Sequence, residues 1–282
     1  MLQRDHYPAG VPCWVDAAFP DAPAATRFYG GLFGWEFEDR IPADVPGHYF
    51  IARLDGLVVA ALASQPDEPE PEPTAWHTYV AVDDADDTAT RAETAGGRVL
   101  VPPTDVFEQG RMAVLEDPAG ATIRAWQPGR RTGAQLVNAP GSWNWSDLNS
   151  NDIAAAEAFY AAVFGWETEK LDFGYGESWM WRRPGYGDFL ATIDPGLRAR
   201  HAESGVPAGF SDAVGWLQPL TDPATPPHWS VTFAVDGTAA AVDRAVELGG
   251  TVVQPVVDAG VSSYAVVRDP QGAQVTLSTY TP

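Results

Sequence analysis

The stretch FYGGLFGWE at residues 28–36 recurs almost unchanged as FYAAVFGWE at residues 159–167. Through each copy, apolar residues recur with i, i+3, i+4 and i+7 spacing, which predicts an amphipathic helix. Gly34 and Gly165 follow that stripe, at the position where a left-handed residue commonly ends a helix. The phrase therefore reads as the end of a helix and the start of a strand. Its repetition predicts that the chain is duplicated.

A second pair of segments extends the duplication. Residues 76–99, WHTYVAVDDADDTATRAETAGGRV, align with residues 229–252, WSVTFAVDGTAAAVDRAVELGGTV, and each reads as strand, helix, Gly-Gly stop and strand. Residues 111–126 and 263–278 then each read as two alternating strands joined by a Pro-Gly turn. Each half is thus predicted to contain two βαβββ units, which makes four in the chain.

The four units predict an α+β protein built from two tandem domains. We expect a first domain at 8–128, with units at 11–63 and 74–127, a linker at 129–141, and a second domain at 142–282, with units at 142–193 and 227–280. Within the halves, the acidic run EPEPEPT at 68–74 and the Gly/Pro-rich stretch from Asp194 to Pro227 are expected to connect the units.

Composition narrows the classes of partner. The formal net charge is −21, so phosphate backbones and anionic membrane surfaces would be repelled rather than attracted. The longest apolar run, LVVAALA at 57–63, is far too short to span a bilayer, and MLQRDHYPAGVP at the start has no apolar signal-peptide core. Cys13 is the single cysteine, which fits a reducing cytoplasm and excludes an internal disulfide. We expect a cytoplasmic monomer or homodimer.

The pattern of FYxxxFGWE after the first helix and DPxG before the last strand resembles the vicinal oxygen chelate superfamily, across nearly the whole chain. That superfamily includes glyoxalase I, bleomycin-resistance proteins and extradiol dioxygenases. The opening PCWVDAAFPDAPAATRFYGGLFGWE looks like the two-domain actinobacterial members called hydroxylase or glyoxalase-like. The resemblance implies sheets that curl into cups. It specifies the reaction weakly, because one fold hosts many functions.

The resemblance also implies where metal ligands would lie. The first-strand position, counted seven residues before the aspartate that precedes each helix, holds tryptophan in all four units: Trp14, Trp76, Trp145 and Trp229. The last-strand position of the second and fourth units holds Arg124 and Thr276. Indole and guanidinium groups do not bind divalent metals, so we predict no metal and no cofactor. His77 and His228 lie one residue from their tryptophans and are expected to point away from the cup, unless that alignment is shifted by one residue.

Period-two geometry predicts which other side chains face the cups. Asp16, Asp147, Thr78 and Trp126 lie two residues from a predicted cup position, and Trp179 and Trp181 share one face of a strand. Tryptophans with a few polar groups suit a flat, partly polar molecule. The predicted ligand-binding residues are Trp14, Trp76, Thr78, Arg124, Trp126, Trp145, Trp179, Trp181, Trp229 and Thr276. Asp16 and Asp147 are the candidate general bases, since burial raises the pKa of a carboxyl group.

Three functions remain open. The leading one is metal-independent binding of a hydrophobic or aromatic small molecule in secondary metabolism, by sequestration or with a cofactor-independent step of lyase, isomerase or oxygenase type. The second is a metal-dependent glyoxalase or dioxygenase whose ligands include a histidine. The third is an interaction protein with filled cups, in which the tryptophans are core residues and Asp16 pairs with Arg124 as a structural ion pair.

Overall fold

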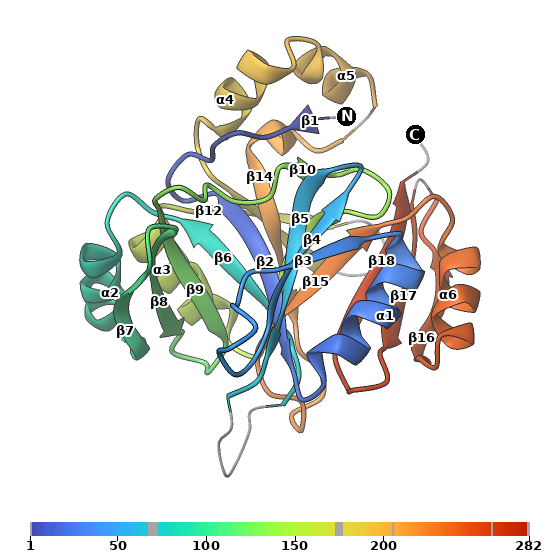
Figure 1. The fold of residues 1–282 in the computed structure, drawn as a ribbon. Helices are drawn as coiled ribbons and strands as arrows, with labels where there is room; N and C mark the ends of the chain where they lie inside the picture. Colours follow the sequence, from blue (N-terminus) through green and yellow to red (C-terminus); the bar gives the residue numbers. More distant parts are fainter. Residues whose placement is uncertain (1, 67–72, 173–176, 205, 261, 281–282) are drawn as a thin grey trace.

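The structure is a computed structural model that describes residues 2–66, 73–172, 177–204, 206–260 and 262–280. Its body consists of two eight-stranded sheets (Figure 1). The first runs in the order β3 (Glu36–Asp39), β4 (Tyr49–Leu54), β5 (Leu57–Ser64), β2 (Pro12–Phe19), β6 (Trp76–Ala81), β9 (Thr122–Pro128), β8 (Gly110–Glu116) and β7 (Arg98–Val106). The second runs in the order β12 (Glu167–Asp172), β13 (Glu177–Arg182), β14 (Ala213–Pro219), β11 (Trp143–Ser150), β15 (His228–Ala234), β18 (Gln274–Tyr280), β17 (Ser262–Arg268) and β16 (Thr251–Asp258).

The two sheets have the same topology, so the predicted α+β class with four βαβββ units is confirmed. In each half the first strands of the two units pair antiparallel, β2 with β6 and β11 with β15. Each of these strands also pairs in parallel with the last strand of its own unit. Both units of a half therefore share one sheet, which the sequence alone did not decide. A further two-stranded ribbon joins β1 (Leu2–Gln3) to β10 (Leu136–Val137).

The helices that precede the repeated tryptophans begin and end as the sequence predicts. In α1 (Ala22–Phe33) the side chain of Asp21 accepts a hydrogen bond from the backbone of the first turn, and Gly34 ends the helix with a φ of 75°. In α3 (Ile153–Phe164), Asp152 and Gly165 do the same. Both glycines adopt the left-handed conformation that other residues avoid.

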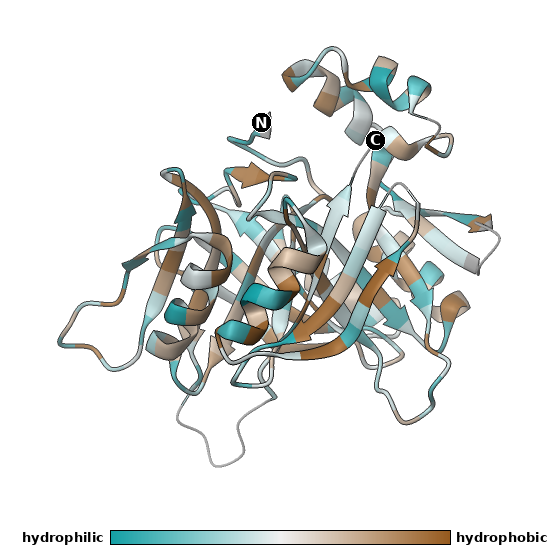
Figure 2. Ribbon diagram, turned by 90° about the vertical axis from the view of Figure 1, so that its right-hand side faces the viewer, coloured by the Kyte–Doolittle hydropathy of each residue, from teal (hydrophilic) through white to brown (hydrophobic). Residues whose placement is uncertain are grey.

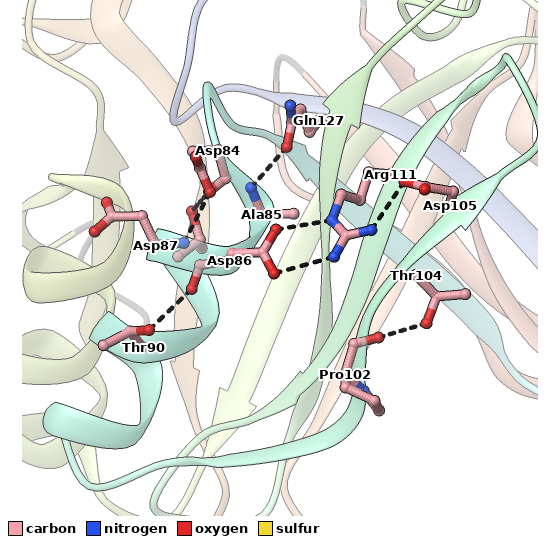
Figure 3. A network of polar contacts seen from close by, with 11 residues as sticks. Asp84, Ala85, Asp86, Asp87, Thr90, Pro102, Thr104, Asp105, Arg111 and Gln127 are labelled. Atoms are coloured by element: carbon pink, nitrogen blue, oxygen red, sulfur yellow. Dashed lines mark hydrogen bonds and ion pairs between the residues drawn. The ribbon is translucent and has the colours of Figure 1, made fainter.

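The second and fourth units begin their helices one residue later than a simple count suggests. In α2 (Ala85–Thr94) the capping residue is Asp84, whose side chain accepts from the backbone amide of Asp87 at 2.9 Å (Figure 3). The guanidinium of Arg111 on β8 donates two hydrogen bonds to the Asp86 carboxylate in the first turn of the same helix (Figure 3). In α6 (Thr238–Glu247) the capping position is Gly237.

The third unit contains an insertion that changes its predicted last strand. The segment FLATI at 189–193, which ends the predicted unit at 142–193 where a last strand belongs, lies in α4 (Tyr186–Ile193). Helix α5 (Leu197–Glu203) and a short 3-10 helix (Phe210–Asp212) follow it. The true last strand is β14, within the stretch expected to be a linker. The prediction of a unit ending at 193 was therefore wrong. In Figures 1 and 2, α4 and α5 stand together at one end of the molecule. The predicted acidic linker at 68–74 lies outside the described residues except for its last two positions.

The repeated segments at 28–36 and 159–167 join the two halves. The Tyr29 hydroxyl donates to Asp269 of the second half at 2.8 Å, and the Trp76 indole N–H donates to Tyr29 at 3.0 Å. In the equivalent contacts from the second copy, the Tyr160 hydroxyl donates to Asp117 of the first half at 3.2 Å, and the Trp229 indole N–H donates to Tyr160 at 2.9 Å. Each tyrosine comes from the phrase, and each aspartate comes from the DPxG turn of the other half. We call these two sets of contacts the reciprocal braces.

The tryptophans of the phrase add a second link. The Trp35 indole donates to the backbone oxygen of Gly141 at 2.7 Å, and the Trp166 indole donates to that of Gly10 at 2.6 Å. Both indoles are buried. The tyrosine and the tryptophan of each copy thus link the two halves, which accounts for their repetition without any catalytic role. Within the described residues, no helix is long and apolar enough to cross a membrane.

Candidate functional site

Each sheet has an interface face, which packs against helices and the other half, and an opposite face, which we call its cup face. Residues directly opposite in an antiparallel pair lie on the same face. Trp14 lies opposite Tyr79, and Asp16 lies opposite His77. Trp145 lies opposite Thr232, and Asp147 lies opposite Ser230. The first cup is formed by Trp14, Asp16, Tyr49, His77, Tyr79, Arg124 and Trp126. The second cup is formed by Trp145, Asp147, Ser178, Trp216, Ser230, Thr232 and Thr276.

Three of the residues predicted to line the cups lie on the interface face instead. Trp76 and Trp229 donate to the tyrosines of the reciprocal braces, and Thr78 donates to Ser146 of the other half at 2.6 Å. The prediction counted from Asp83 and Asp236, whereas the capping residues are Asp84 and Gly237. Because the side-chain period of a strand is two, a one-residue error moves a side chain to the other face.

Trp179 and Trp181 also lie away from the second cup. They share one face of β13, as predicted, but lie opposite Leu217 and Gly215, which alternate with the cup residue Trp216. Trp181 is fully buried and packs against Tyr160 with ring centroids 5.5 Å apart. The period-two pattern identified a shared face correctly, but it could not say which face would be covered.

The corrected count places His77, rather than Trp76, at the first-strand position of the second unit. Burial, with a smaller contribution from Arg124, lowers the pKa of His77 to about 3, so the imidazole is neutral near pH 7. The equivalent positions in the other units hold Trp14, Trp145 and Ser230. Across the described residues, no three His, Cys, Asp or Glu side chains converge as a metal site requires. His228 is exposed, with Nδ1 2.9 Å from the oxygen of Pro226. The donor set does not fit a divalent metal.

Asp16 is held in a complete hydrogen-bond network. Its Oδ2 accepts from the hydroxyls of Tyr79 at 2.7 Å and Tyr49 at 3.4 Å, and its Oδ1 accepts from Arg124 at 3.2 Å. Burial raises the pKa of Asp16, against the opposing effects of Arg124 and the tyrosine hydroxyls. The ion pair considered from the sequence is therefore present, and Asp16 is only 5% exposed.

The linker between the halves lies over one edge of the first cup. The guanidinium of Arg131 lies 5.4 Å from the centre of the Trp14 ring, and the Trp126 indole donates to the Arg131 oxygen at 2.9 Å. Trp14 and Trp126 are both buried. The first cup is thus filled largely by its own side chains, and its carboxylate is fully partnered.

The second cup lacks those partners. Where the first cup has Tyr79 and Arg124 as neighbours across a parallel pair, the second has Thr232 and Thr276. Asp147 Oδ1 is buried and accepts no hydrogen bond from any described residue. Burial raises the pKa of Asp147 to about 7, opposed only by a hydrogen bond from the Trp216 backbone. A carboxyl group with this pKa exchanges protons readily near neutral pH.

Aromatic side chains surround this carboxyl. Trp145 lies two residues away on the same face, and Trp216 is the register partner of Asp147 on β14. The two indole centroids are 6.3 Å apart, and Phe210 of the insertion contacts Trp145 at 5.9 Å and Trp216 at 6.5 Å. Both indoles and Asp147 are partly exposed, whereas Trp76, Trp181 and Trp229 of the interface face are buried. We call Trp145, Asp147, Phe210 and Trp216 the carboxylate cage.

Trp216 and Phe210 were missed in the sequence because they fall in the stretch interpreted as a linker. The alternation in AVGWLQP at 213–219 is the signal that could have identified β14. Two surface hollows, of about 230 and 360 Å³, lie at the seams between the halves. Asp269 and Gln271 help to line the first, and Phe164 and Arg183 help to line the second. Neither hollow is lined by a cup residue.

The chain was compared with protein families and with known proteins. Residues 14–125 match the glyoxalase/bleomycin resistance protein/dioxygenase superfamily, and residues 131–278 match a glyoxalase-like domain. A putative glyoxylase of Mycobacterium tuberculosis is 36% identical over 275 residues, covering 97% of this chain and 96% of the relative. An anthracycline biosynthesis protein of Streptomyces peucetius, DnrV, is 36% identical over 276 residues, covering 94% and 91%.

Solved structures share the fold at low sequence identity. The Mn(II)-bound glyoxalase of Novosphingobium aromaticivorans superposes with a TM-score of 0.59 at 16% identity, covering 96% of this chain and 82% of the other. The 2,2',3-trihydroxybiphenyl 1,2-dioxygenase of Sphingomonas wittichii also superposes with a TM-score of 0.59, at 14% identity, covering 96% and 91%. At these identities the likeness concerns the fold alone.

Proposed function

Because the chain belongs to the glyoxalase/bleomycin resistance protein/dioxygenase superfamily, we propose that it binds a hydrophobic, aromatic small molecule in the second cup without a metal. The observation that carries this proposal is Oδ1 of Asp147, which is buried, accepts no hydrogen bond from any described residue and lies beside two partly exposed indoles. Such an arrangement costs stability unless something else uses it, since buried polar groups are normally hydrogen-bonded.

The cage suits a flat ligand. Trp145 and Trp216 supply broad apolar surfaces, Phe210 spans them, and Thr276 and Ser230 add hydroxyl groups at the floor. Ligand pockets commonly combine such aromatic walls with a few polar groups that fix orientation. The first cup, by contrast, is proposed to be structural, with Asp16 holding Arg124 and the tyrosines together. Only one of the two candidate carboxylates, Asp147, then remains a candidate for proton transfer.

Asp147 would act as a general base and then as a general acid. A proton would leave a C–H or O–H group of the bound compound for Oδ1 of Asp147, and the same proton would return to a different atom of that compound. The net change is an isomerisation, which needs no oxidant, reductant or cofactor. A pKa of about 7 places the carboxyl where proton transfer in both directions is efficient at neutral pH.

The relatives support a place in secondary metabolism. DnrV is named for anthracycline biosynthesis, and anthracycline is an aromatic product class of the kind that the cage would accommodate. The putative glyoxylase relative and the metal-bound glyoxalase structure keep a metal-dependent reaction as the rival function. Among the positions where the superfamily's enzymes hold ligands, only His77 is an effective metal donor, and the others hold tryptophan, serine, arginine and threonine. One imidazole does not hold a divalent metal, so the donor set argues against the rival. We further propose that the protein acts in the cytoplasm as a monomer or homodimer.

The test is a binding titration that uses the tryptophan fluorescence of the protein, with the location of binding read from the variants. 1,8-Dihydroxyanthraquinone is added to the wild-type protein, to Trp216→Leu and to Trp14→Phe. We expect quenching by the wild type and by Trp14→Phe, and at least about a ten-fold weaker affinity for Trp216→Leu, equivalent to the loss of one aromatic contact. Equal affinity in all three proteins would contradict binding in the second cup.

Metal content distinguishes the proposed metal-independent binding from the rival metal-dependent function. The protein is purified without chelator, analysed by mass spectrometry for manganese, iron, nickel and zinc, and titrated again after treatment with a chelator. We expect the affinity for the anthraquinone to be unchanged by the chelator. One tightly bound metal ion per chain, together with loss of binding on its removal, would favour the glyoxalase or dioxygenase function.

A further inference from the structure

The carboxylate cage has the composition of a site for an organic cation. Asp147 provides a negative charge, and Trp145, Trp216 and Phe210 provide ring faces within one contact network. Indole faces attract cations through their quadrupole, and this attraction is largest where water is excluded. A carboxylate with a free Oδ1 supplies the hydrogen-bond acceptor that an ammonium group needs.

No basic side chain of the described chain competes for Asp147. The residue equivalent to Arg124 of the first cup is Thr276. Arg182 lies on β13, which β14 separates from the strand of Asp147, and it pairs with Glu169 at 3.3 Å and with Glu167 at 3.6 Å. The nearby hydrogen-bond donors are also used elsewhere: the Asn149 amide donates to the Ser230 hydroxyl, and that hydroxyl donates to the backbone oxygen of Asp147. Among the described residues, Oδ1 of Asp147 is therefore left without a hydrogen-bond donor.

The overall charge favours the same kind of ligand. With a formal net charge of −21, the protein attracts cations over long distances and repels anions. A neutral aromatic compound would use the indoles but would leave Asp147 unpaired, and an anionic compound would oppose it directly. A compound with a protonated nitrogen uses both parts of the cage.

We propose that the ligand of the second cup is an aromatic compound that carries a protonated amine, and that the ammonium group pairs with Asp147 while its flat part stacks on Trp145 and Trp216. This inference rests on the proposed function, since it names the class of ligand for the same cup. It adds a charge requirement that aromatic binding alone does not impose.

The effect of pH on Asp147 must be distinguished from its effect on the other titratable groups around the cage. His228 lies on the same face of β15, His201 of α5 contacts Phe210 at 5.2 Å, and Arg182 lies on β13. Both histidines remain when Asp147 is replaced by asparagine. A pH effect that disappears in Asp147→Asn therefore belongs to Asp147.

The experiment compares three probes of one shape: 1-naphthylmethylamine, 1-naphthalenemethanol and 1-naphthoate. Affinities are measured by calorimetry at pH 7 for the wild-type protein, for Asp147→Asn, and for Asp243→Asn, which removes one exposed carboxylate from α6 and so matches the change in net charge. We expect the wild type and Asp243→Asn to bind the amine more than about ten-fold tighter than the alcohol, and the carboxylate probe weakest. Asp147→Asn should bind the amine and the alcohol about equally.

Proton release provides a second readout. A pKa of about 7 leaves Asp147 about half protonated at pH 7, so binding an ammonium group should release about half a proton. Calorimetry in two buffers of different ionisation enthalpy measures this number. The alcohol, and the Asp147→Asn variant with any probe, should release none.

The outcomes distinguish this inference from the proposed function. Amine selectivity that is lost only in Asp147→Asn supports both. Equal binding of amine and alcohol by the wild type, with weaker binding by Trp216→Leu, overturns the charge requirement and leaves aromatic binding in the second cup intact. Absence of binding by every probe, including 1,8-dihydroxyanthraquinone, overturns both.

Discussion

The two cups are built on the same scaffold and differ in how they treat one carboxyl group. In the first cup, Asp16 is bonded by Tyr49, Tyr79 and Arg124 and is closed off from water. In the second, Asp147 occupies the same strand position without such partners, and it faces two partly exposed tryptophans. The comparison shows that a few neighbouring side chains decide whether both oxygens of a buried carboxylate have hydrogen-bond partners.

The halves are otherwise alike. Each has the same strand order, the same helix caps in its first unit and the same tyrosine brace to the other half. The difference is concentrated in the cup faces and in the insertion of α4 and α5, which brings Phe210 against the second cup. Duplication thus permits the two halves to differ at their cup faces while they share one fold.

The largest effect on the free energy of unfolding is expected when Asp16, the carboxyl of the first cup, loses its positively charged partner. Arg124→Met leaves Asp16 buried with no countercharge, so we expect the free energy of unfolding to fall by about 3–5 kcal/mol. Urea denaturation measures this value. Thr276→Val, at the matched position of the second cup, should cost less than about 1 kcal/mol. Similar losses for both variants would remove the proposed distinction between the cups.

The second prediction converts the second cup toward the first. Thr276→Arg places a guanidinium group near Asp147, which should lower the pKa of that carboxyl from about 7 by about 1–3 units. Carbon-13 NMR of the aspartate carboxyl groups, titrated from pH 3 to 9, follows the change. The variant should also lose its preference for 1-naphthylmethylamine over the alcohol. An unchanged pKa would mean that Asp147 does not face position 276.

The third prediction concerns the dependence of stability on pH. The folded-state pKa of Asp147, about 7, lies above its value in the unfolded chain, so the folded state holds the proton more tightly. The resulting stabilisation is complete below about pH 4 and is lost as pH rises to about 7. Asp147→Asn lacks this loss.

Between pH 4 and 7, the variant should therefore gain about 2 kcal/mol relative to the wild type, after allowance for water reaching the cup. Urea denaturation at several pH values tests the direction. Asp243→Asn, in which the replaced carboxylate is exposed on α6, should follow the wild-type curve. A variant curve parallel to the wild type would show that the carboxyl of Asp147 titrates normally.

The smallest effect tests the likeness of the halves. Tyr29→Phe and Tyr160→Phe each remove a hydroxyl that bridges an indole and a buried aspartate, so each should cost about 1–2 kcal/mol. Because the braces are equivalent, the two losses should agree, whereas the paired substitutions in the cups should not. Differential scanning calorimetry of both variants measures the comparison. A large difference between the tyrosines would extend the asymmetry beyond the cups.

Much of the fold could be predicted because its signals are local. The stripe of apolar residues, the glycines after it and the DPxG turns each depend on neighbours in sequence. The count of units and the α+β class followed from their repetition. The failures also have local causes: Asp83 was taken for the capping residue instead of Asp84, and α4 was read as a strand because FLATI is a short apolar run, which periodicity alone does not distinguish from a strand.

The site was harder to predict, because the face of a strand that becomes covered depends on how distant parts of the chain pack against it. Trp76 and Trp229 looked like ligand-binding residues but complete the reciprocal braces. Trp216 and Phe210 looked like linker residues but line the cage. Asp147 was a candidate from the sequence, as was Asp16, and nothing in the local sequence showed that one would be paired and the other left open.

By itself, the sequence determined the duplication, the number of units and the order of strands and helices in most of them, because spacing and residue type carry that information along the chain. Only the tertiary structure decided which face of each strand is covered, which units share a sheet and which carboxyl keeps an unpartnered oxygen. Those properties depend on residues far apart in sequence, such as Asp16 and Arg124 or Asp147 and Trp216. The physical reason is that burial and pairing set the pKa and the availability of a charged group, and both arise only when the chain is folded.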